Sequence, residues 1–548
     1  MKKRWLAALV TGCLAAGLAA YAATANGSSS GPTAKTGGTF RIGTSSRIDS
    51  LNPYVAFNQD AYSTFEYVYP FLIQYDKANR KFVADFATKW KASNGGKTWT
   101  FTVRKGAKWT DGKPLTAKDA AWTINTDIKY AAGGAANAAG LIAHIKNAKA
   151  PNATTLVVNY AKAPGNVLGQ FQQFAILPQH IWSKHTGHKG NDLKRFSNNP
   201  LVGAGPFELS KFKKDDIALF QRNGSFYAEK PLVDGFGLRM FSNEDALVSA
   251  LKAHEIDAIE DVPGTAIKTL KKSFNVRAVT GVSQTDFIIN SNPKKKKHKE
   301  LLNLKVKAAM AHAIDRKQIV RVVFLGYGKP AGSIIPPATG GWYNPGVRPE
   351  SFNLALANKI LDRLGFKKGS GGIRVANGHK MSYEVITPTD VPSTNRTFQI
   401  LQPDFKKIGI QLKQRALDST AAFDAITAPD GKYLNFDLSL WNWVALIDPD
   451  FMLSVVTCAQ YEGWSDSGFC DKKYDAMYSQ QQLTPNQAKR KALVWKMQRY
   501  LQAKRPYVWL AAQDAVWAVS KGWGGLVASP QGPFNSINKL SLTRVHQQ

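Results

Sequence analysis

The chain has 548 residues, of which 44% are hydrophobic and 11% aromatic. This length and composition exclude a disordered chain and are typical of about two to four domains with buried cores. The formal net charge is +33, from 72 Lys and Arg against 39 Asp and Glu, so we expect a positive surface that attracts anionic neighbours or serves only solubility.

The first 25 residues have the pattern of a secretory signal peptide. A basic start, MKKR, precedes an apolar run from Trp5 to Ala25 that ends in small residues. The Ala23–Ala25 triplet fits ordinary cleavage, whereas Val10–Cys13 resembles a lipobox in which Cys13 would be lipidated and retained. An uncleaved anchor is a third alternative, because the run is long enough to span a bilayer. We expect cleavage and export to the periplasm or the outer face of the cytoplasmic membrane.

A Gly- and Ser-rich tether, residues 26–37, leads into a body of mixed α/β pattern. Trp99, Phe101 and Val103 alternate with threonines, which predicts a half-buried strand. Thr116 can cap the next helix, with Asp119 in the capping-box position. A helix followed by a strand is expected at 243–261 and at 397–416, and further helices at 303–314, 316–326 and 354–365.

The cysteines favour one disulfide. Of the three cysteines, Cys13 belongs to the export segment, which leaves Cys458 and Cys470. An even remainder in an oxidising compartment predicts that these two are bonded, and two buried free thiols are the alternative.

The sequence carries no complete catalytic, cofactor or metal motif, so we expect no enzyme activity, no cofactor and no metal. Gly27–Gly31 has the letters of G-x-S-x-G but lacks the strand and the helix of a nucleophile elbow. The metal alternative would use the imidazoles of His180, His185 and His188. The lysine-rich run 294–299 has no aromatic residues between its lysines, so we expect no nucleic-acid partner.

Several segments follow one another in a recognisable order. KTWTFTVRKGAKWTDGKPLTAKDAAWTI at 97–124 is the most specific, and the others include RIDSLNPY, ILPQHI, VGAGPFEL, LKVKAAMAHAIDRKQIV, LALANKILDRLGF and WNW…DPDF. Together they resemble the family 5 extracellular solute-binding proteins, which are the receptors of oligopeptide, dipeptide and nickel ABC importers. The resemblance covers the chain from about residue 38 to its end.

The resemblance implies an α/β, periplasmic-binding-protein-like fold, with two lobes joined by a hinge and an extra subdomain. Lobe I would comprise 38–72, 204–282 and 516–548, the inserted subdomain 73–203, and lobe II 283–515. A monomeric receptor of this kind would capture a small ligand by hinge closure and deliver it to an ABC permease in the membrane. Peptide is the expected ligand, and oligosaccharides, nickel chelates and opines are the alternatives.

The expected ligand contacts centre on WNWVALIDPD, residues 441–450. Trp441 and Trp443 should share one face of an extended segment, either as a ligand wall or as core. Trp464, inside the expected disulfide loop, is a further candidate contact. The Asp448-Pro449 step is either a ligand contact or a structural turn.

Two departures from peptide-binding relatives concern charge. Those relatives hold the peptide ammonium with an aspartate between the tryptophan and the downstream Asp-Pro, but Val444–Ile447 contains no acid. Arg47 stands where some oligopeptide receptors have an acid, and it is included among the expected site residues. A buried ammonium needs a paired charge, so the sequence favours an anionic or neutral ligand over a free peptide N-terminus.

Two other classes of function compete with the receptor. A secreted hydrolase would turn over a substrate and would lose that turnover when one Ser, Asp or Glu is replaced. A basic wall-polymer-binding protein would bind polyanions with an affinity that falls steeply with salt.

Overall fold

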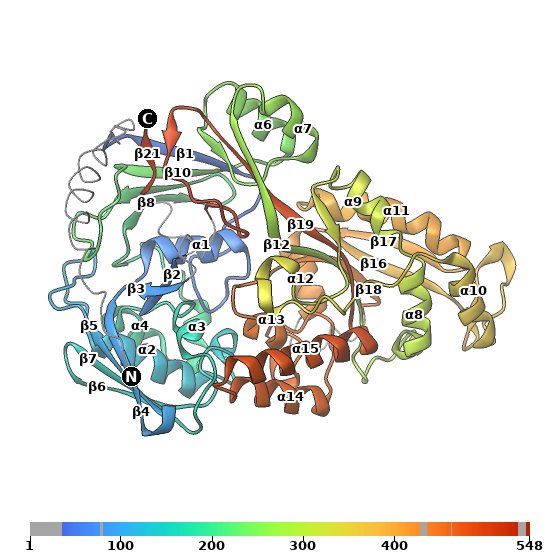
Figure 1. The fold of residues 1–548 in the computed structure, drawn as a ribbon, viewed down its shortest axis with the longest axis horizontal. Coiled ribbons are helices and arrows are strands. Elements are labelled where there is room, and N and C mark those ends of the chain that lie inside the picture. The colour runs from blue at the N-terminus through green and yellow to red at the C-terminus, as the bar shows by residue number, and fades with distance from the viewer. Residues whose placement is uncertain (1–34, 77–80, 428–435, 462, 535–543) are drawn as a thin grey trace, which may run out of the picture.

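Two lobes lie side by side in the protein (Figure 1). The computed structural model describes residues 35–76, 81–427, 436–461, 463–534 and 544–548. The expected signal peptide, Cys13 and most of the tether lie outside these residues. In the part described, no helix has both the length and the apolar character needed to cross a bilayer.

One 11-stranded sheet runs through both lobes. Its strands are β1 (Thr39–Thr44), β8 (Phe207–Lys213), β9 (Ile217–Arg222), β10 (Gly235–Met240), β11 (Ala258–Ile259), β12 (Asn275–Ile289), β13 (Gly328–Pro330), β16 (Ser382–Pro388), β17 (Gln411–Leu417), β18 (Leu438–Val444) and β19 (Tyr507–Val519). Their order is β17-β16-β18-β12-β19-β11-β1-β10-β9-β8, with β13 beside β19. The sheet is mixed, because β1 pairs parallel with β10 and β11 whereas β12 pairs antiparallel with β18 and β19.

The two long strands β12 and β19 connect the lobes. The first half of β12, from Asn275 to Thr280, pairs with the end of β19 beside the lobe I strands, and its second half lies between β18 and β19 in lobe II. The register between β12 and β19 shifts between Thr280 and Gln284. Gly281 lies in this interval, where a Cβ would come within 2.4 Å of the carbonyl oxygen of Gln513. The sheet therefore passes from one lobe to the other through an irregular stretch that only a glycine fits.

Lobe I packs short helices against its strands. These are α1 (Gln59–Val68), α6 (Glu244–Lys252) and α7 (Gly264–Leu270). The side chain of Asn243 caps α6 by accepting a hydrogen bond from Ala246 N at 2.8 Å. The predicted helix and strand at 243–261 are confirmed as α6 and β11.

The subdomain is a second sheet with a covering helix. Its strands β4 (Ala87–Ser93), β5 (Thr98–Val103), β6 (Ile145–Asn152) and β7 (Thr155–Tyr160) pair in the order β4-β5-β7-β6. Helix α2 (Ala117–Tyr130) begins after Thr116, and the Thr116–Asp119 capping box predicted from the sequence is present. Short helices α3 (Val167–Phe171), α4 (Gln179–Trp182) and α5 (Asp192–Arg195) follow, and the hairpin of β2 (Ile73–Asp76) and β3 (Lys81–Ala84) precedes the sheet.

Lobe II covers both faces of β16, β17 and β18. One face packs against α8 (Leu304–His312), α9 (Arg316–Val322), α10 (Leu354–Arg363) and α11 (Pro392–Lys407). The other packs against α12 (Ser419–Thr427), α13 (Asp450–Ser454), α14 (Lys472–Gln482) and α15 (Gln487–Lys504). The helices predicted at 303–314, 316–326 and 354–365 are confirmed, as is the helix and strand at 397–416.

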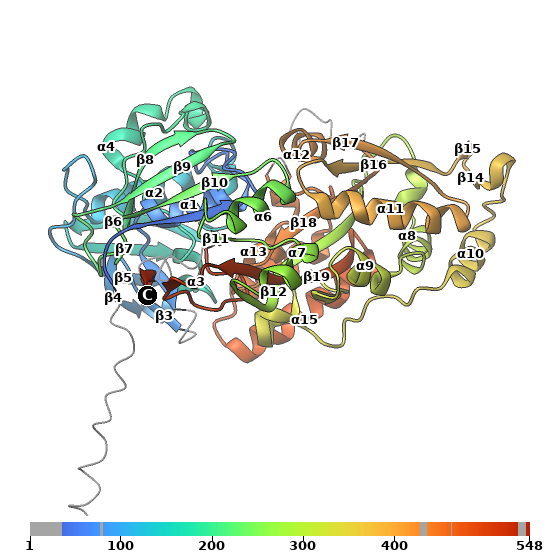
Figure 2. The same cartoon turned by 90° about the horizontal axis from the view of Figure 1, so that it is seen from above.

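The beginning and the end of the described chain meet on lobe I. Lys35 N donates a hydrogen bond to Gln547 O at 3.3 Å. The strand β21 (His546–Gln547) also pairs with β20 (Trp523–Gly524). Figure 2 shows the C-terminus on the lobe I side, far from α10 at the tip of lobe II.

Candidate functional site

A cavity of about 330 Å³ lies between the lobes and the subdomain. Its lining residues come from Ser46–Phe71 of lobe I, Thr123–Leu177 of the subdomain and Pro388–Trp464 of lobe II. This volume falls within the range of small-molecule sites, which bury most of the ligand surface. Because no one part of the chain encloses the cavity, its shape depends on how the lobes are placed.

Two of the predicted residues form one wall from strand β18. Trp441 and Trp443 both line the cavity. They lie on the same face of the sheet, because they stand opposite Asp286 and Gln284 of β12 in an antiparallel pair. The indole of Trp443 donates a hydrogen bond from Nε1 to Asp466 Oδ2 at 2.9 Å, which fixes the ring orientation.

Trp464 extends this wall from a covalently closed loop. Cys458 and Cys470 form the disulfide that the cysteine count predicts, and Trp464 lies inside the loop they close. Its backbone N–H donates to Gln460 Oε1 at 3.2 Å, and its ring centroid is 6.1 Å from that of Trp443. The loop therefore presents a large aromatic ring to the cavity from a short, cross-linked segment.

Aromatic side chains also meet from opposite sides of the cavity. Phe57 of lobe I stacks on Phe423 of α12, with ring centroids 4.8 Å apart and ring planes 1° from parallel. Tyr62 of α1 lies against Trp464, with 6.3 Å between centroids. All four residues line the cavity, so ring contacts join the two lobes around it.

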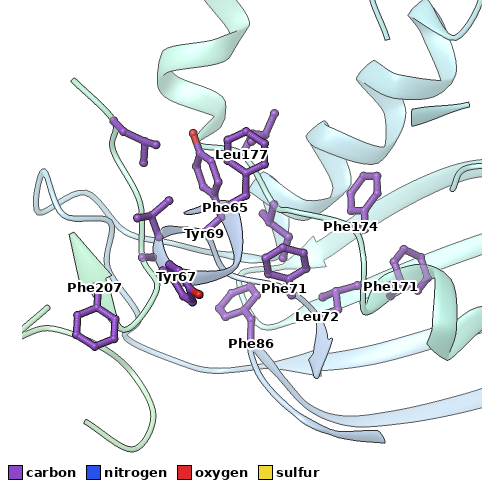
Figure 3. Packing of buried hydrophobic residues seen from close by; sticks show 14 of the residues in the cluster. Phe65, Tyr67, Tyr69, Phe71, Leu72, Phe86, Phe171, Phe174, Leu177 and Phe207 are labelled. Carbon is purple, nitrogen blue, oxygen red and sulfur yellow. The ribbon is translucent and has the colours of Figure 1, made fainter. Parts of the chain in front are cut away.

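Behind the lobe I side, the cavity wall merges with a buried aromatic core. Figure 3 shows Phe65, Phe71, Phe174 and Leu177 among the packed rings of this core, and these four side chains also line the cavity. Residues of a core shared by lobe I and the subdomain thus form part of the site.

The charged side chains that line the cavity in the described part of the chain are all acidic. Among the described lining residues there is no lysine, arginine or histidine, whereas Glu66, Asp127 and Asp450 are present. Burial raises the pKa of Asp127 to about 7, although the Tyr54 hydroxyl donates to its carboxyl at 2.8 Å and opposes the shift. Burial, together with the nearby charge of Asp448, also raises the pKa of Asp450.

Asp448 is held away from the cavity wall by an ion pair. Arg490 donates from both of its terminal nitrogens to the two Asp448 oxygens, at 2.6 and 2.7 Å, and the side chains are 1% and 10% exposed. Asp448 Oδ1 also accepts from Asp450 N at 2.9 Å, which makes the predicted turn before α13. Asp448 is not among the lining residues, because both oxygens bind these internal donors; Val444 and Leu446 line the cavity from the interval without acids.

Arg47 also lies off the wall. Its side chain is 41% exposed and faces Asp215 at 3.6 Å and Asp390 at 3.8 Å. Its neighbour Ser46 lines the cavity, but Arg47 does not. One of these acids belongs to lobe I and the other to lobe II, so the guanidinium lies between the two lobes.

The three histidines considered for a metal have separate partners. His180 bonds to Asp111 and His188 to Asp192, each at 2.7 Å, and His185 stacks on Phe196. In the described ranges, no group of three or more His, Cys, Asp and Glu side chains is placed to hold a metal ion.

Sequence reasoning did not find Phe57, Phe423 or Asp127. Phe57 and Phe423 are 366 positions apart, and neither stands in a motif that would single it out. Asp127 reads as an ordinary helix residue of α2. The alternation of Trp441 and Trp443 did predict a shared face, because alternate residues of a strand point to the same side of the sheet.

Comparison with known proteins decides the family. The sequence profile of the bacterial extracellular solute-binding proteins, family 5, matches residues 81–463. The chain belongs to this family. Its members are solute-binding receptors, and the fold expected from the resemblance, with two α/β lobes, is confirmed.

Individual relatives are distant but cover most of the chain. Protein XP55 of Streptomyces lividans is 26% identical over 91% of this chain and 88% of its own length. A probable ABC transporter-binding protein of Deinococcus radiodurans is 26% identical over 99% of this chain and 98% of its own. The oligopeptide-binding protein AppA of Bacillus subtilis, solved with a nonapeptide, superimposes with a TM-score of 0.84 at 20% identity, covering 94% of this chain and all of AppA. The last similarity shows a shared fold.

Proposed function

We propose that this family 5 protein is the extracytoplasmic receptor of an ABC importer and that it captures a small peptide between its lobes. The observation that carries the proposal is the cavity enclosed jointly by lobe I, the subdomain and lobe II. The Deinococcus relative is described as an ABC transporter-binding protein and the Bacillus neighbour was solved with a peptide, which supports both parts of the proposal.

Closure of the lobes would couple binding to transport. A ligand that touches both lobes binds the closed state more tightly than the open one, and this difference in affinity drives closure. We propose lobe I at 38–72, 204–282 and 516–548, the subdomain at 73–203 and lobe II at 283–515. The shift in register near Gly281 lies at the proposed boundary between lobes, so the hinge would be the β12 and β19 pair.

The tryptophans would be the main ligand contacts. Trp441, Trp443 and Trp464 present flat apolar surfaces with polar edges, which suit a peptide side chain or the face of a peptide bond. Phe57 and Phe423 would complete the enclosure when the lobes close. Arg47 and Asp448 have structural roles in this proposal, because each is engaged by charged protein partners.

The receptor itself would do no covalent chemistry. The exported chain would act as a monomer, would need neither cofactor nor metal, and would dock in its closed form on a membrane permease that supplies the energy of import. The mature chain would begin at Asn26 if the signal peptide is cleaved as the Ala23–Ala25 triplet predicts.

Titration calorimetry with a panel of short peptides tests the proposal, with small-angle scattering on the same samples. We expect saturable one-site binding and a smaller radius of gyration in the complex. Trp443→Ala should weaken binding at least about tenfold, because it removes one of the largest aromatic contacts in the cavity. Trp495→Ala, at a half-buried tryptophan of α15 that lies outside the cavity, is the matched control and should bind as the wild type does. Binding to polyanions alone, without compaction, would contradict the receptor.

A further inference from the structure

One acid of the cavity wall has no counter-charge in the described part of the protein. Asp127 lies in the last turn of α2, lines the cavity and is 3% exposed. Burial and the Tyr54 hydroxyl are the two influences that set its pKa, so no described lysine, arginine or histidine compensates the charge of its carboxylate. A buried carboxylate is normally paired, because it otherwise loses its hydration without compensation. A cation supplied by the ligand would find an unmatched partner here.

The other two acids of the wall are engaged by the protein. Asp450 accepts hydrogen bonds from the side-chain amides of Gln481 and Gln482. Glu66 also interacts within the protein. Asp127, by contrast, has a single donor among the described residues, which leaves most of the acceptor capacity of its carboxylate for a ligand.

The carboxyl group of Asp127 is held in position from one side. Its Oδ1 accepts from the Tyr54 hydroxyl at 2.8 Å, whereas its Oδ2 accepts from none of the described donors. Tyr54 is itself fixed, because its backbone N–H donates to Asn52 Oδ1 at 2.8 Å and its ring packs edge-on against Trp182, with centroids 5.4 Å apart. A carboxyl group oriented in this way is pre-organised, since a ligand need not order it on binding.

The surroundings of Asp127 also suit a cation. The carboxyl end of a helix carries partial negative charge, which favours a cation and makes an acid in the last turn unfavourable for stability. Asn137, which donates to the Tyr54 carbonyl oxygen at 3.3 Å, lines the cavity too, and its side-chain carbonyl is a neutral acceptor. An ammonium has three donors and can bond to a carboxylate and to such an amide together.

We propose that Asp127 selects the ligand by charge: its carboxylate binds a cationic group of the ligand, an ammonium or a guanidinium, on the subdomain side of the cavity. The tryptophans of lobe II would contact the apolar part of the same ligand. This inference rests on the proposed peptide-receptor function and names its substrate class, which is peptides that bring a positive group into the cavity. That group is either a free N-terminus or a basic side chain.

Four amidated dipeptides that differ in their positive groups test the proposal by titration calorimetry. Norleucyl-Phe-amide carries only the terminal ammonium and N-acetyl-Lys-Phe-amide only the side-chain ammonium, whereas Lys-Phe-amide carries both. N-acetyl-norleucyl-Phe-amide carries neither and matches lysine in chain length. We expect at least one singly charged probe to bind about tenfold more tightly than the neutral probe, through its hydrogen bond to a charged group. The singly charged probe that binds tighter identifies the source of the cation.

Asp127→Asn should remove this preference. Asparagine keeps the size of the side chain and can still accept from the Tyr54 hydroxyl, but it cannot pair with a cation. The preferred cationic probe should therefore lose about tenfold in affinity, and the neutral probe should bind as before. Asp245→Asn, at the exposed start of α6, removes the same charge away from the cavity and is the matched control. Circular dichroism checks that each variant is folded.

Proton release gives a check that does not depend on affinity. Burial raises the pKa of Asp127 to about 7, so at pH 6 the carboxyl group is mostly protonated without ligand. A bound cation favours the carboxylate, and up to about one proton should leave when the preferred cationic probe binds. Calorimetry at pH 6 in two buffers of different ionisation enthalpy measures this release. The neutral probe should release no proton, and neither should any probe that binds Asp127→Asn.

The outcomes separate this inference from the proposed function. If the neutral probe binds as tightly as the cationic ones, or if Asp127→Asn keeps the preference or the proton release, the role of Asp127 is wrong and the peptide receptor stands. If none of the four probes binds the wild type saturably, the peptide-receptor function fails, and this inference fails with it.

Discussion

Phe57 and Phe423 stack face to face across the cavity, with ring centroids 4.8 Å apart. One ring belongs to the loop before α1 and the other to α12, so the pair spans lobe I and lobe II. A stacked pair contributes about 0.5–1.5 kcal/mol beyond the apolar area it buries. The contact should therefore favour the closed arrangement.

Phe423→Ala should shift the protein towards an open form and weaken ligand binding. The loss of the stacking alone predicts roughly a two- to tenfold weaker affinity. Small-angle scattering of the ligand-free variant should show a larger radius of gyration than the wild type. Phe352→Ala, at a ring that is 42% exposed on lobe II, is the control and should change neither quantity.

Arg490→Gln should destabilise lobe II. The substitution leaves the buried Asp448 carboxylate without its counter-charge, and breaking a buried pair in this way costs about 3–5 kcal/mol in the free energy of unfolding. Replacing both partners, as Asp448→Leu with Arg490→Met, should be less harmful than Arg490→Gln alone. Denaturant unfolding of the wild type and the two variants measures this, and a double variant less stable than Arg490→Gln would contradict the explanation.

Asp127→Asn should change how stability depends on pH. In the folded protein the pKa of Asp127 is raised to about 7 by burial, whereas an unfolded aspartate has a pKa near 3.9. Between about pH 4 and pH 7 the folded state keeps a proton that the unfolded state has lost, so raising the pH lowers the free energy of unfolding, by at most about 1.4 kcal/mol per pH unit. Above about pH 7 this loss is complete.

Asparagine does not titrate, so the variant should not lose free energy of unfolding in this way. The free energy of unfolding of the variant relative to the wild type should therefore be higher at pH 8 than at pH 5. Unfolding curves at the two pH values provide the comparison. Asp245→Asn, at the exposed start of α6, is the matched control. A wild-type and Asp127→Asn difference that is the same at both pH values would show that Asp127 does not titrate in this window.

Removing the disulfide should affect stability and binding together. Cys458→Ser with Cys470→Ser opens a loop of sequence separation 12, and the chain-entropy model predicts a loss of about 3 kcal/mol. Because Trp464 lies in this loop, the affinity for ligand should fall as well. Mild reduction of the wild type should reproduce both effects. A fall in stability with unchanged affinity would show that packing alone positions Trp464.

Local features of the fold could be predicted because short-range physics determines them. The capping box of Thr116 and Asp119, the strand around Phe101 and the turn at Asp448 all depend on neighbours within a few residues. The family resemblance added the two-lobe arrangement, which periodicity alone does not supply.

The parts of the site that the sequence did not predict depend on partners far away along the chain. Asp448 could be read as a ligand contact because Arg490, 42 positions later, is invisible in the local sequence. Arg47 suggested a cavity suited to anions, but Asp215 and Asp390 engage it outside the wall. Arg47 therefore gives no support to an anionic ligand once these tertiary contacts are known.

The hydrogen bond between Lys35 and Gln547 brings the first described residue beside the C-terminal strand on lobe I. A lipid attachment at Cys13, the alternative to cleavage, would hold lobe I from its N-terminal side and leave lobe II as the part that moves. A fluorophore fused after Gln548 would move with the held lobe and report little of the motion. A label on α10 of lobe II, far from the C-terminus, would move with lobe II and report closure directly (Figure 2).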